Sequence, residues 1–231
     1  MKETLRIITQ ALQNGRKVLL EPEAKTICME YNIPVARFKF AKNLEDAVEF
    51  AEALGYPVVL KIVSADIIHK SEAGAVMVNI KNKNELQDAY KRVFENVKRY
   101  NATAKIDGVL VQEMVPQSTE VIVGSVRDPQ FGPTLMFGLG GIFVEILKDV
   151  TFKIVPISRE DALEMVTAIK AYPLLKGYRN TPPVAIDAIV DILSNTSRLV
   201  MDNPQIKELD LNPILVDENN AKTVDARIIL E

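Results

Sequence analysis

Short apolar segments follow one another closely after residue 107, with turns rich in proline and glycine between them. Two neighbouring parallel strands need a crossover of a dozen or more residues, and these connections are shorter than that. The second half of the chain is therefore restricted to an antiparallel meander. The expected strands lie in GVLVQEMV, TEVIVGSVRD, GPTLMFGL, GIFVEILKD and VTFKIVPI.

The meander is followed by two helical patterns and a hairpin. Ser158 caps the helix expected in SREDALEMVTAIKAY, and a longer helix is expected to start near the double proline of TPPVAIDAIVDILSNTSRLVMDN. The closing segment, ELDLNPILVDENNAKTVDARIIL, predicts two strands joined at Asn219 and Asn220. Asparagine tolerates the positive φ that such tight turns use.

The first half of the chain mixes helical and extended patterns. Leu5, Ile8 and Leu12 have helical spacing within residues 2–14, and Gly15 is placed to end that helix. Further helices are expected from EPEA onward, in NLEDAVEFAEALG and in NKNELQDAYKRVFENVKRY, and strands in IPVARFKFA, PVVLKIV and AVMVNI.

These elements predict an α+β protein in three parts. Helices occupy residues 1–35, a smaller α+β unit residues 36–107, and a larger antiparallel α+β unit residues 108–231. No linker of glycine, serine or proline separates the last two parts. A cleft between them is therefore the expected ligand site.

Composition argues against several classes of protein. The net charge of the 231 residues is -3, and no lysine or arginine block suggests a nucleic-acid-binding face. One cysteine allows no intramolecular disulfide, and the N-terminal residues lack the apolar core of a signal peptide. No window approaches the roughly 18 apolar residues that cross a bilayer. We expect a soluble protein of the cytoplasm.

Lys61 is the one charged residue of the apolar strand PVVLKIV. Burying its ammonium without a partner costs several kcal/mol, so the group must reach a partner or a cleft. An edge strand with the lysine facing water would satisfy it equally well.

Two glutamates and a glycine-rich turn are weaker candidates. Glu113 ends an apolar strand before Val115 and Pro116, and Glu120 begins the next one. Strand ends between two units can present backbone groups to a base and a carboxylate to a ribose, although both glutamates also fit the solvent side of alternating strands. The GLGG turn from Gly138 allows a close backbone approach, or is a plain turn.

The closing hairpin gathers oxygen-bearing side chains. Asp210 and Asn212 share one face of their strand, and the turn brings Asp225 opposite Asn212. Hard oxygen ligands of this kind suit Mg²⁺, which also retains water and substrate phosphates. Acids and asparagines are common around hairpins, so this pattern alone leaves a structural role open.

His69, the single histidine, lies in the loop SADIIHKSEAGAV. As an isolated residue it fits an ordinary surface position. Structural zinc needs four nitrogen or sulfur ligands, and the chain offers one histidine and one cysteine. A serine hydrolase would need a GxSxG element, which is absent from the sequence. A catalytic nucleophile requires only one histidine.

Several segments, in order along the chain, resemble the β subunit of ADP-forming acetyl-CoA (acyl-CoA) synthetases, which are relatives of succinyl-CoA synthetase. The resemblance implies the ATP-grasp fold, in which two α+β subdomains hold the nucleotide in the cleft between them. The matching segments are EPEAKTICMEYNIPV, GYPVVLKIVSADIIHKSEAGAV, GVLVQEMVPQSTEVIVGSVRDPQFGP, GLGGIFVEILKD and ELDLNPILV.

The resemblance assigns roles that the residues alone do not. It implies that Lys61 contacts the phosphates of ATP or ADP, that Glu113 and Val115 frame the adenine, and that Glu120 holds the ribose. It also implies that Asn212 and Asp225 bind Mg²⁺.

In this family His69 would carry a phosphoryl group on a mobile loop, with Asp210 orienting its ring. A CoA-binding α subunit would form the acyl phosphate and pass the phosphoryl group to His69, which delivers it to ADP. The sequence has no CoA-binding domain, so we expect a hetero-oligomer, α2β2. Two alternatives stay open, an ATP-grasp carboxylate–amine ligase and a nucleotide-binding regulatory subunit without catalysis.

Overall fold

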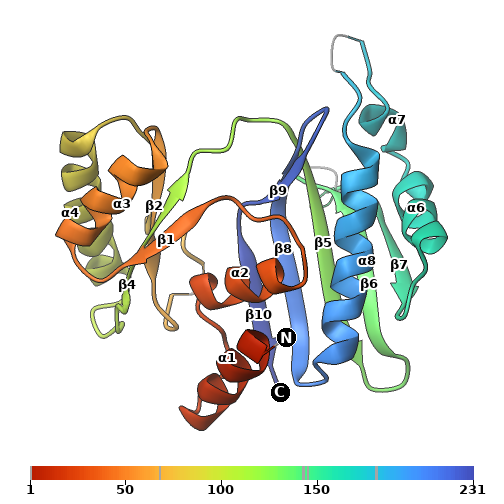
Figure 1. Ribbon diagram of the computed structural model, residues 1–231, viewed down its shortest axis with the longest axis horizontal. Coiled ribbons are helices and arrows are strands. Elements are labelled where there is room, and N and C mark those ends of the chain that lie inside the picture. The colour runs from red at the N-terminus through yellow and green to blue at the C-terminus, as the bar shows by residue number, and fades with distance from the viewer. Residues whose placement is uncertain (1, 68, 142–143, 145, 180–181) are drawn as a thin grey trace. The chain divides into compact units, whose positions relative to one another are not determined.

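The computed structural model describes residues 2–67, 69–141, 144, 146–179 and 182–231 (Figure 1). The chain forms two compact units. The smaller unit contains Leu20–Pro22 and Ala36–Val115, and the larger one contains Met1–Leu19, Glu23–Val35 and Pro116–Glu231. No helix in the described part of the chain has the length and apolar character needed to cross a membrane.

The smaller unit is built on a four-stranded antiparallel sheet in the order β1-β4-β2-β3. Every residue of β2 is buried, and β2 lies between β4 and β3, so PVVLKIV forms an interior strand and the edge-strand alternative is excluded. The bounds of the strands are β1 Phe38–Ala41, β2 Val58–Val63, β3 Val76–Ile80 and β4 Gly108–Glu113.

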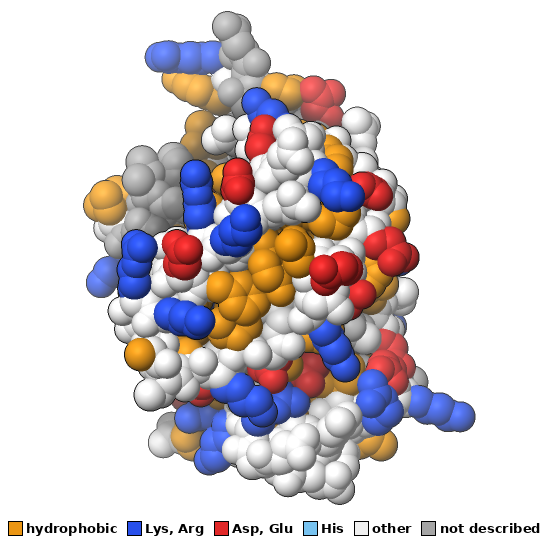
Figure 2. All heavy atoms as spheres, turned by 90° about the vertical axis from the view of Figure 1, so that its left-hand side faces the viewer, with side chains coloured by type: hydrophobic (Ala, Val, Ile, Leu, Met, Phe, Trp, Pro, Cys, Tyr) orange, Lys and Arg blue, Asp and Glu red, His pale blue; other side chains and the backbone are white. Residues whose placement is uncertain are grey.

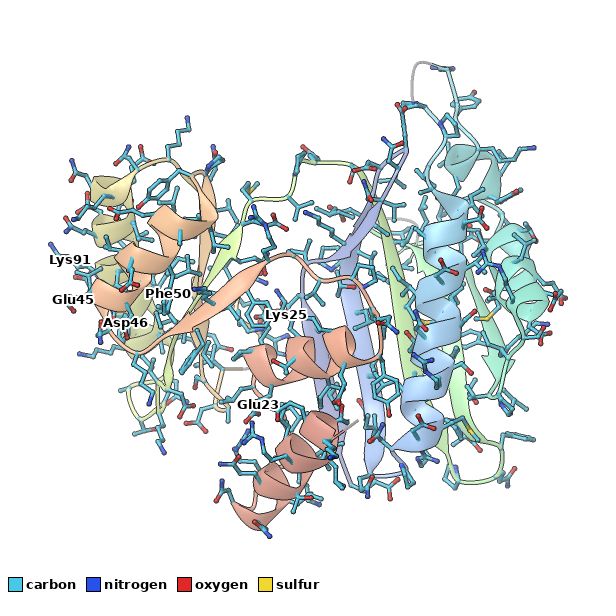
Figure 3. The ribbon with its side chains drawn as sticks, in the orientation of Figure 1. Glu23, Lys25, Glu45, Asp46, Phe50 and Lys91 are labelled. Atoms are coloured by element: carbon cyan, nitrogen blue, oxygen red, sulfur yellow. The ribbon has the colours of Figure 1, made fainter. Side chains whose placement is uncertain are left out.

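Helices α3 (Leu44–Leu54) and α4 (Lys83–Tyr100) complete the core of the smaller unit. The side chain of Asn43 accepts a hydrogen bond from the amide of Asp46 at 2.8 Å, and Gly55 ends α3 with a positive φ. Figure 3 labels Phe50 on α3 and Lys91 on α4. On the face shown in Figure 2, hydrophobic side chains gather in a central patch with charged side chains around it.

The larger unit contains a six-stranded antiparallel sheet. Its order is β10-β8-β5-β6-β7, and β9 pairs with β8. The meander expected from the short connections is therefore present in β5, β6 and β7. The bounds are β5 Thr119–Asp128, β6 Gly132–Leu139, β7 Val150–Ile154, β8 Ile206–Val216, β9 Ala221–Thr223 and β10 Ala226–Leu230.

Helices pack against the larger sheet and form one apolar core with it (Figure 1). The apolar residues of α2 and the turn after it that join this core are Ala24, Ile27, Cys28 and Tyr31. Ser158 and Asp161 form a reciprocal capping box at the start of α6. The bounds are α1 Lys2–Gln13, α2 Glu21–Glu30, α6 Arg159–Ala168, α7 Tyr172–Leu175 and α8 Ile186–Asp202.

The domain boundary differs from the one inferred from the sequence. Strand β4 lies in the smaller sheet because it pairs with β1 and β2, so the smaller unit extends to Val115 and does not end at residue 107. Most of residues 1–35 belong to the larger unit, because the apolar faces of α1 and α2 join its core.

Several local expectations were wrong. Helix α1 buries Ile7, Ile8 and Ala11, whereas Leu5 is 60% exposed. The turn after β8 has no positive φ at Asn219 or Asn220, because the carboxylate of Asp217 accepts both of their amides instead.

Other expected elements have different bounds. The strand expected in IPVARFKFA contains only β1, and α8 begins at Ile186, after the double proline. The strand expected in GIFVEILKD falls partly outside the described residues, and the described residues 146–148 are not extended.

Candidate functional site

The candidate residues fall in both units. Lys61, His69, Glu113 and Val115 belong to the smaller unit. Glu120, Asp210, Asn212 and Asp225 belong to the larger one. Within each unit the structure places these side chains and their partners.

The loop that carries His69 connects the interior strand β2 to β3. Its first part is tied to the Lys105 backbone, whose carbonyl accepts the Ser64 hydroxyl at 2.6 Å and whose amide donates to Asp66 at 2.8 Å. Its last part is tied to α4, because the Asn96 side chain donates to the Gly74 carbonyl at 2.9 Å. Gly74 has a φ of 60°, and a side chain there would collide with Asn96. Both ends of the loop are thus anchored.

The side chain of His69 is 64% exposed. Its Nδ1 lies 3.9 Å from a carboxylate oxygen of Glu72, which is exposed as well. An accessible imidazole is free to approach a phosphorus atom, as a nucleophile must. The local structure is therefore compatible with a phosphate carrier, while the role itself stays a prediction.

Lys61 points into a buried ion pair. Its Nζ lies 2.7 Å from Oε1 of Glu21, the first residue of α2, and the two side chains are only 5% and 2% exposed. A second lysine reaches the same carboxylate, because Nζ of Lys70 lies 3.0 Å from Oε2 of Glu21. The sequence required a partner for Lys61 but did not identify Glu21, which lies 40 positions earlier.

Glu113 is buried at the end of β4, which excludes the alternative that it lies on the solvent side of the strand. Its carboxylate accepts the backbone amide of Arg37 at 2.9 Å and the Arg37 Nε at 2.7 Å. The Glu113 amide donates in turn to the Arg37 carbonyl. The side chain therefore fixes the end of β4, two residues before Val115, to the backbone of Arg37.

Glu120 is the second residue of β5 in the larger unit and is exposed. Its carbonyl accepts the amide of Gly140 at 2.7 Å, and a side chain at Gly140 would lie 2.9 Å from the Glu120 Cβ. The GLGG turn therefore allows a close backbone approach, and what it approaches is the strand that carries Glu120. An exposed carboxylate at this strand start can accept hydrogen bonds from a ribose.

The closing hairpin brings Asn212 and Asp225 together. The Asn212 amide donates to the Asp225 carbonyl at 3.2 Å, and the pairing of β8 with β10 continues from there through Leu211 and Ala226. Asp210 lies on the same face as Asn212, because side chains alternate along β8. Their carboxylate and amide oxygens are donors of the kind that Mg²⁺ accepts. Asn212 and Asp225 could therefore supply oxygen ligands to Mg²⁺, with water and phosphate oxygens as the other ligands.

Asp210 lines a pocket of about 240 Å³ in the larger unit, together with Arg227, Met136 and Phe152. Burial raises the pKa of the Asp210 carboxyl above its ordinary value, and the negative charge of Asp225 raises it further. The Arg227 guanidinium, 4.0 Å away, opposes the rise in pKa. The pocket thus holds a carboxylate whose charge is disfavoured, a common property of functional sites.

Substitution Asp210→Asn is expected to raise the melting temperature at neutral pH. A carboxyl with a raised folded-state pKa binds more protons folded than unfolded, so its contribution to stability falls as pH rises from the ordinary aspartate range through the raised pKa. The advantage of the variant should therefore shrink in melts at about pH 3, below the ordinary aspartate pKa. Glu218→Gln, in the exposed turn, is the control. An equal gain in melting temperature at both pH values would contradict a raised pKa of the Asp210 carboxyl.

Lys25 was not singled out from the sequence. Its side chain is completely buried, and Figure 3 shows it on the opposite side of α2 from Glu23. Glu23 forms a two-point ion pair with Arg16, with both distances 2.8 Å. Lysine is almost never buried this completely, which makes Lys25 a candidate functional residue. Its place in the motif EPEAK was the one available signal.

Comparison with known proteins agrees with this architecture. A family model described as ATP-grasp domain matches residues 10–230. A solved structure of the dinucleotide-forming acetyl-coenzyme A synthetase 1 of Ca. Korarchaeum cryptofilum, in complex with coenzyme A and Ca-AMPCP, is 49% identical. Its TM-score is 0.96, and the match covers 98% of this chain and 99% of that one. The fold and the family model thus define an ATP-grasp protein.

Sequence similarity to known proteins identifies the family within the ATP-grasp class. The β subunit of ADP-forming acetate–CoA ligase I from Pyrococcus furiosus is 54% identical over 224 residues, which are 97% of this chain and 96% of that protein. The β subunit of ligase II from the same organism is 50% identical, over 99% of this chain and 98% of that protein. The chain belongs to the family of ADP-forming acetate–CoA ligase β subunits.

Proposed function

We propose that this chain is the phosphoryl-transfer subunit of an ADP-forming acyl-CoA synthetase and that His69 carries the phosphoryl group. The observation that carries the proposal is the position of the single histidine. It is exposed on an anchored loop, and the next residue, Lys70, shares one buried carboxylate with Lys61. Another Ca. Korarchaeum cryptofilum structure, 46% identical, is described with Mg-AMPPCP and a phosphohistidine segment pointing towards the nucleotide binding site.

The exchange with nucleotide is a single covalent step on this chain. In the direction from ATP, a ring nitrogen of His69 forms a bond to the γ-phosphorus. The bond from that phosphorus to the β–γ bridging oxygen breaks, and ADP leaves with the electron pair. The reverse step makes ATP from phosphohistidine and ADP. A neutral imidazole nitrogen serves in both directions as nucleophile and leaving group.

The remaining residues would position and neutralise phosphate. Phosphoryl transfer depends mainly on alignment and charge compensation, so a lysine such as Lys61 near the phosphates suffices. Glu120 would accept from the ribose, and the backbone at Val115 would face the adenine. Asn212 and Asp225 would hold Mg²⁺, which when bound neutralises charge on the nucleotide phosphates. Asp210 would orient the imidazole of His69.

An α subunit would complete the reaction. The ADP-forming acetate–CoA ligase I of Archaeoglobus fulgidus is 46% identical to 97% of this chain, which covers 32% of that longer protein. The rest of such a chain has room for the CoA-binding part that a separate β subunit lacks. We propose that this chain assembles with a CoA-binding α subunit as α2β2 in the cytoplasm.

The test is phosphate-dependent ATP synthesis by the chain with its α subunit, Mg²⁺, ADP and several acyl-CoAs. We expect ATP, free acid and CoA in equal amounts, with no product when phosphate is omitted. A regulatory module would bind ATP in calorimetry but form no ATP. A carboxylate–amine ligase would instead consume ATP only with an amine acceptor. Either of these results would overturn the proposal.

A further inference from the structure

The shared carboxylate of Glu21 connects two functional parts of the smaller unit. One is Lys61 in the rigid strand β2, and the other is Lys70 in the loop, directly after His69. The Lys70 side chain is 16% exposed, while that of the neighbouring His69 is 64% exposed. Lys70 thus points toward the carboxylate of Glu21, whereas the side chain of the preceding residue, His69, points to the surface.

We propose that Glu21 is a positioning residue that holds the His69 loop in its resting place through Lys70, and that a phosphoryl group on His69 releases this hold. The inference rests on the proposed role of His69. It adds to that role a specific contact that retains the loop and a reason for the contact to weaken when the loop is loaded.

The Lys70–Glu21 ion pair differs from the other contacts that anchor the loop, because it depends on the attraction between two charged groups. Ser64, Asp66 and Gly74 are fixed by hydrogen bonds to Lys105 and Asn96, at the two ends of the loop. Between those ends, Ile67 and Ala73 are buried by packing. Among the contacts described for residues 64–75, the Lys70–Glu21 ion pair is the anchor next to His69 that a change of charge can weaken.

Phosphorylation supplies that change of charge. A phosphoryl group adds a charge of about -1.5 to -2 at neutral pH and three strong acceptor oxygens. Lysine has a flexible stem and a compact ammonium, so Lys70 can turn from Glu21 to the new anion beside it. Glu21 keeps Lys61 as a partner at 2.7 Å, so its carboxylate is not left buried without a counter-charge. Release therefore exchanges one ion pair for another.

Chemical phosphorylation tests the hold independently of the enzyme reaction. Phosphoramidate transfers its phosphoryl group to an imidazole nitrogen and releases ammonia, and the chain contains one histidine. Hydrogen exchange of the Ala73 and Ala75 amides reports on the loop, because they donate to the carbonyls of His69 and Lys70 at 3.1 and 2.8 Å. Exchange of amides in β2 and β4 shows that the rest of the unit is intact.

In the wild-type chain, phosphorylation should speed exchange of the loop amides about tenfold, the factor that corresponds to 1.4 kcal/mol. Lys70→Gln should show the faster exchange before phosphorylation and little further change after it. Lys70→Arg should behave as the wild type, since it keeps the positive charge. Glu72→Gln is the matched control in the same loop and should also respond as the wild type.

Two results would overturn the proposal: wild-type exchange that phosphorylation leaves unchanged, or unmodified Lys70→Gln exchange equal to that of the wild type. Glu21→Gln provides a second variant, expected to loosen the loop as Lys70→Gln does. These experiments separate the proposed role of the Lys70–Glu21 ion pair from the proposed role of His69 as phosphate carrier. A loop that does not loosen can still carry a phosphoryl group from ATP, and a loop that loosens with phosphoramidate can be inactive with ATP.

Discussion

His69→Asn is expected to abolish the phosphoenzyme and to lower the rate of ATP formation by about 10⁴-fold or more, as loss of a covalent nucleophile does. The chain has no second histidine to take over the group. Incubation with Mg²⁺ and ATP labelled at the γ position, with the α subunit present, should label the wild type. The label should be acid-labile and base-stable, and absent from the variant.

The loss of activity in His69→Asn should come from the missing nucleophile and not from unfolding. The His69 side chain is exposed, and substitutions at exposed positions usually change stability by less than about 0.5 kcal/mol. Thermal melting and calorimetric ATP affinity should therefore match the wild type. Glu72→Gln, whose carboxylate lies 3.9 Å from the imidazole, is the control and should keep its label. Equal labelling of His69→Asn and wild type would refute the assignment of His69 as phosphate carrier.

The parts of the fold that the sequence predicted well are those set by local patterns. The apolar segment around Lys61 predicted a strand, and the cap residue Ser158 marked a helix start correctly. The alternation of side chains along β8 and the short turn after it were enough to bring Asn212 next to Asp225. In each case the determining interactions lie within a few residues or across one hairpin.

The parts that could not be predicted depend on distant pairing. Strand β4 follows α4 and precedes β5 in the chain, yet it pairs with β1 and β2, and no local signal distinguishes its apolar pattern from that of β5. Lys61 pairs with Glu21, which lies 40 positions away in the sequence, and Glu113 pairs with Arg37, which lies 76 positions away. The sequence shows that a buried charge needs a partner, but only the fold selects which one.

Lys61→Met is expected to lower the free energy of unfolding by about 3 kcal/mol, the lower end of what removing one partner of a buried ion pair costs. The lower end applies because Lys70 stays 3.0 Å from Glu21 and compensates part of its charge. Urea unfolding of both proteins measures the difference. Calorimetry should also show weaker ATP binding, because the ammonium proposed to meet the phosphates is gone.

Lys153→Met is the matched control for this prediction. Nζ of Lys153 lies 2.6 Å from carboxylates of both Asp161 and Glu164, so its ion pairs are as short as that of Lys61. They lie at the surface, however, with Asp161 and Glu164 39% and 69% exposed, and ion pairs at the surface contribute little to stability because water and salt screen them. Equal losses in the two variants would show that burial does not strengthen the Lys61–Glu21 contact. A larger loss for Lys61→Met, reduced when Glu21→Gln is added, would attribute the difference to that buried pair.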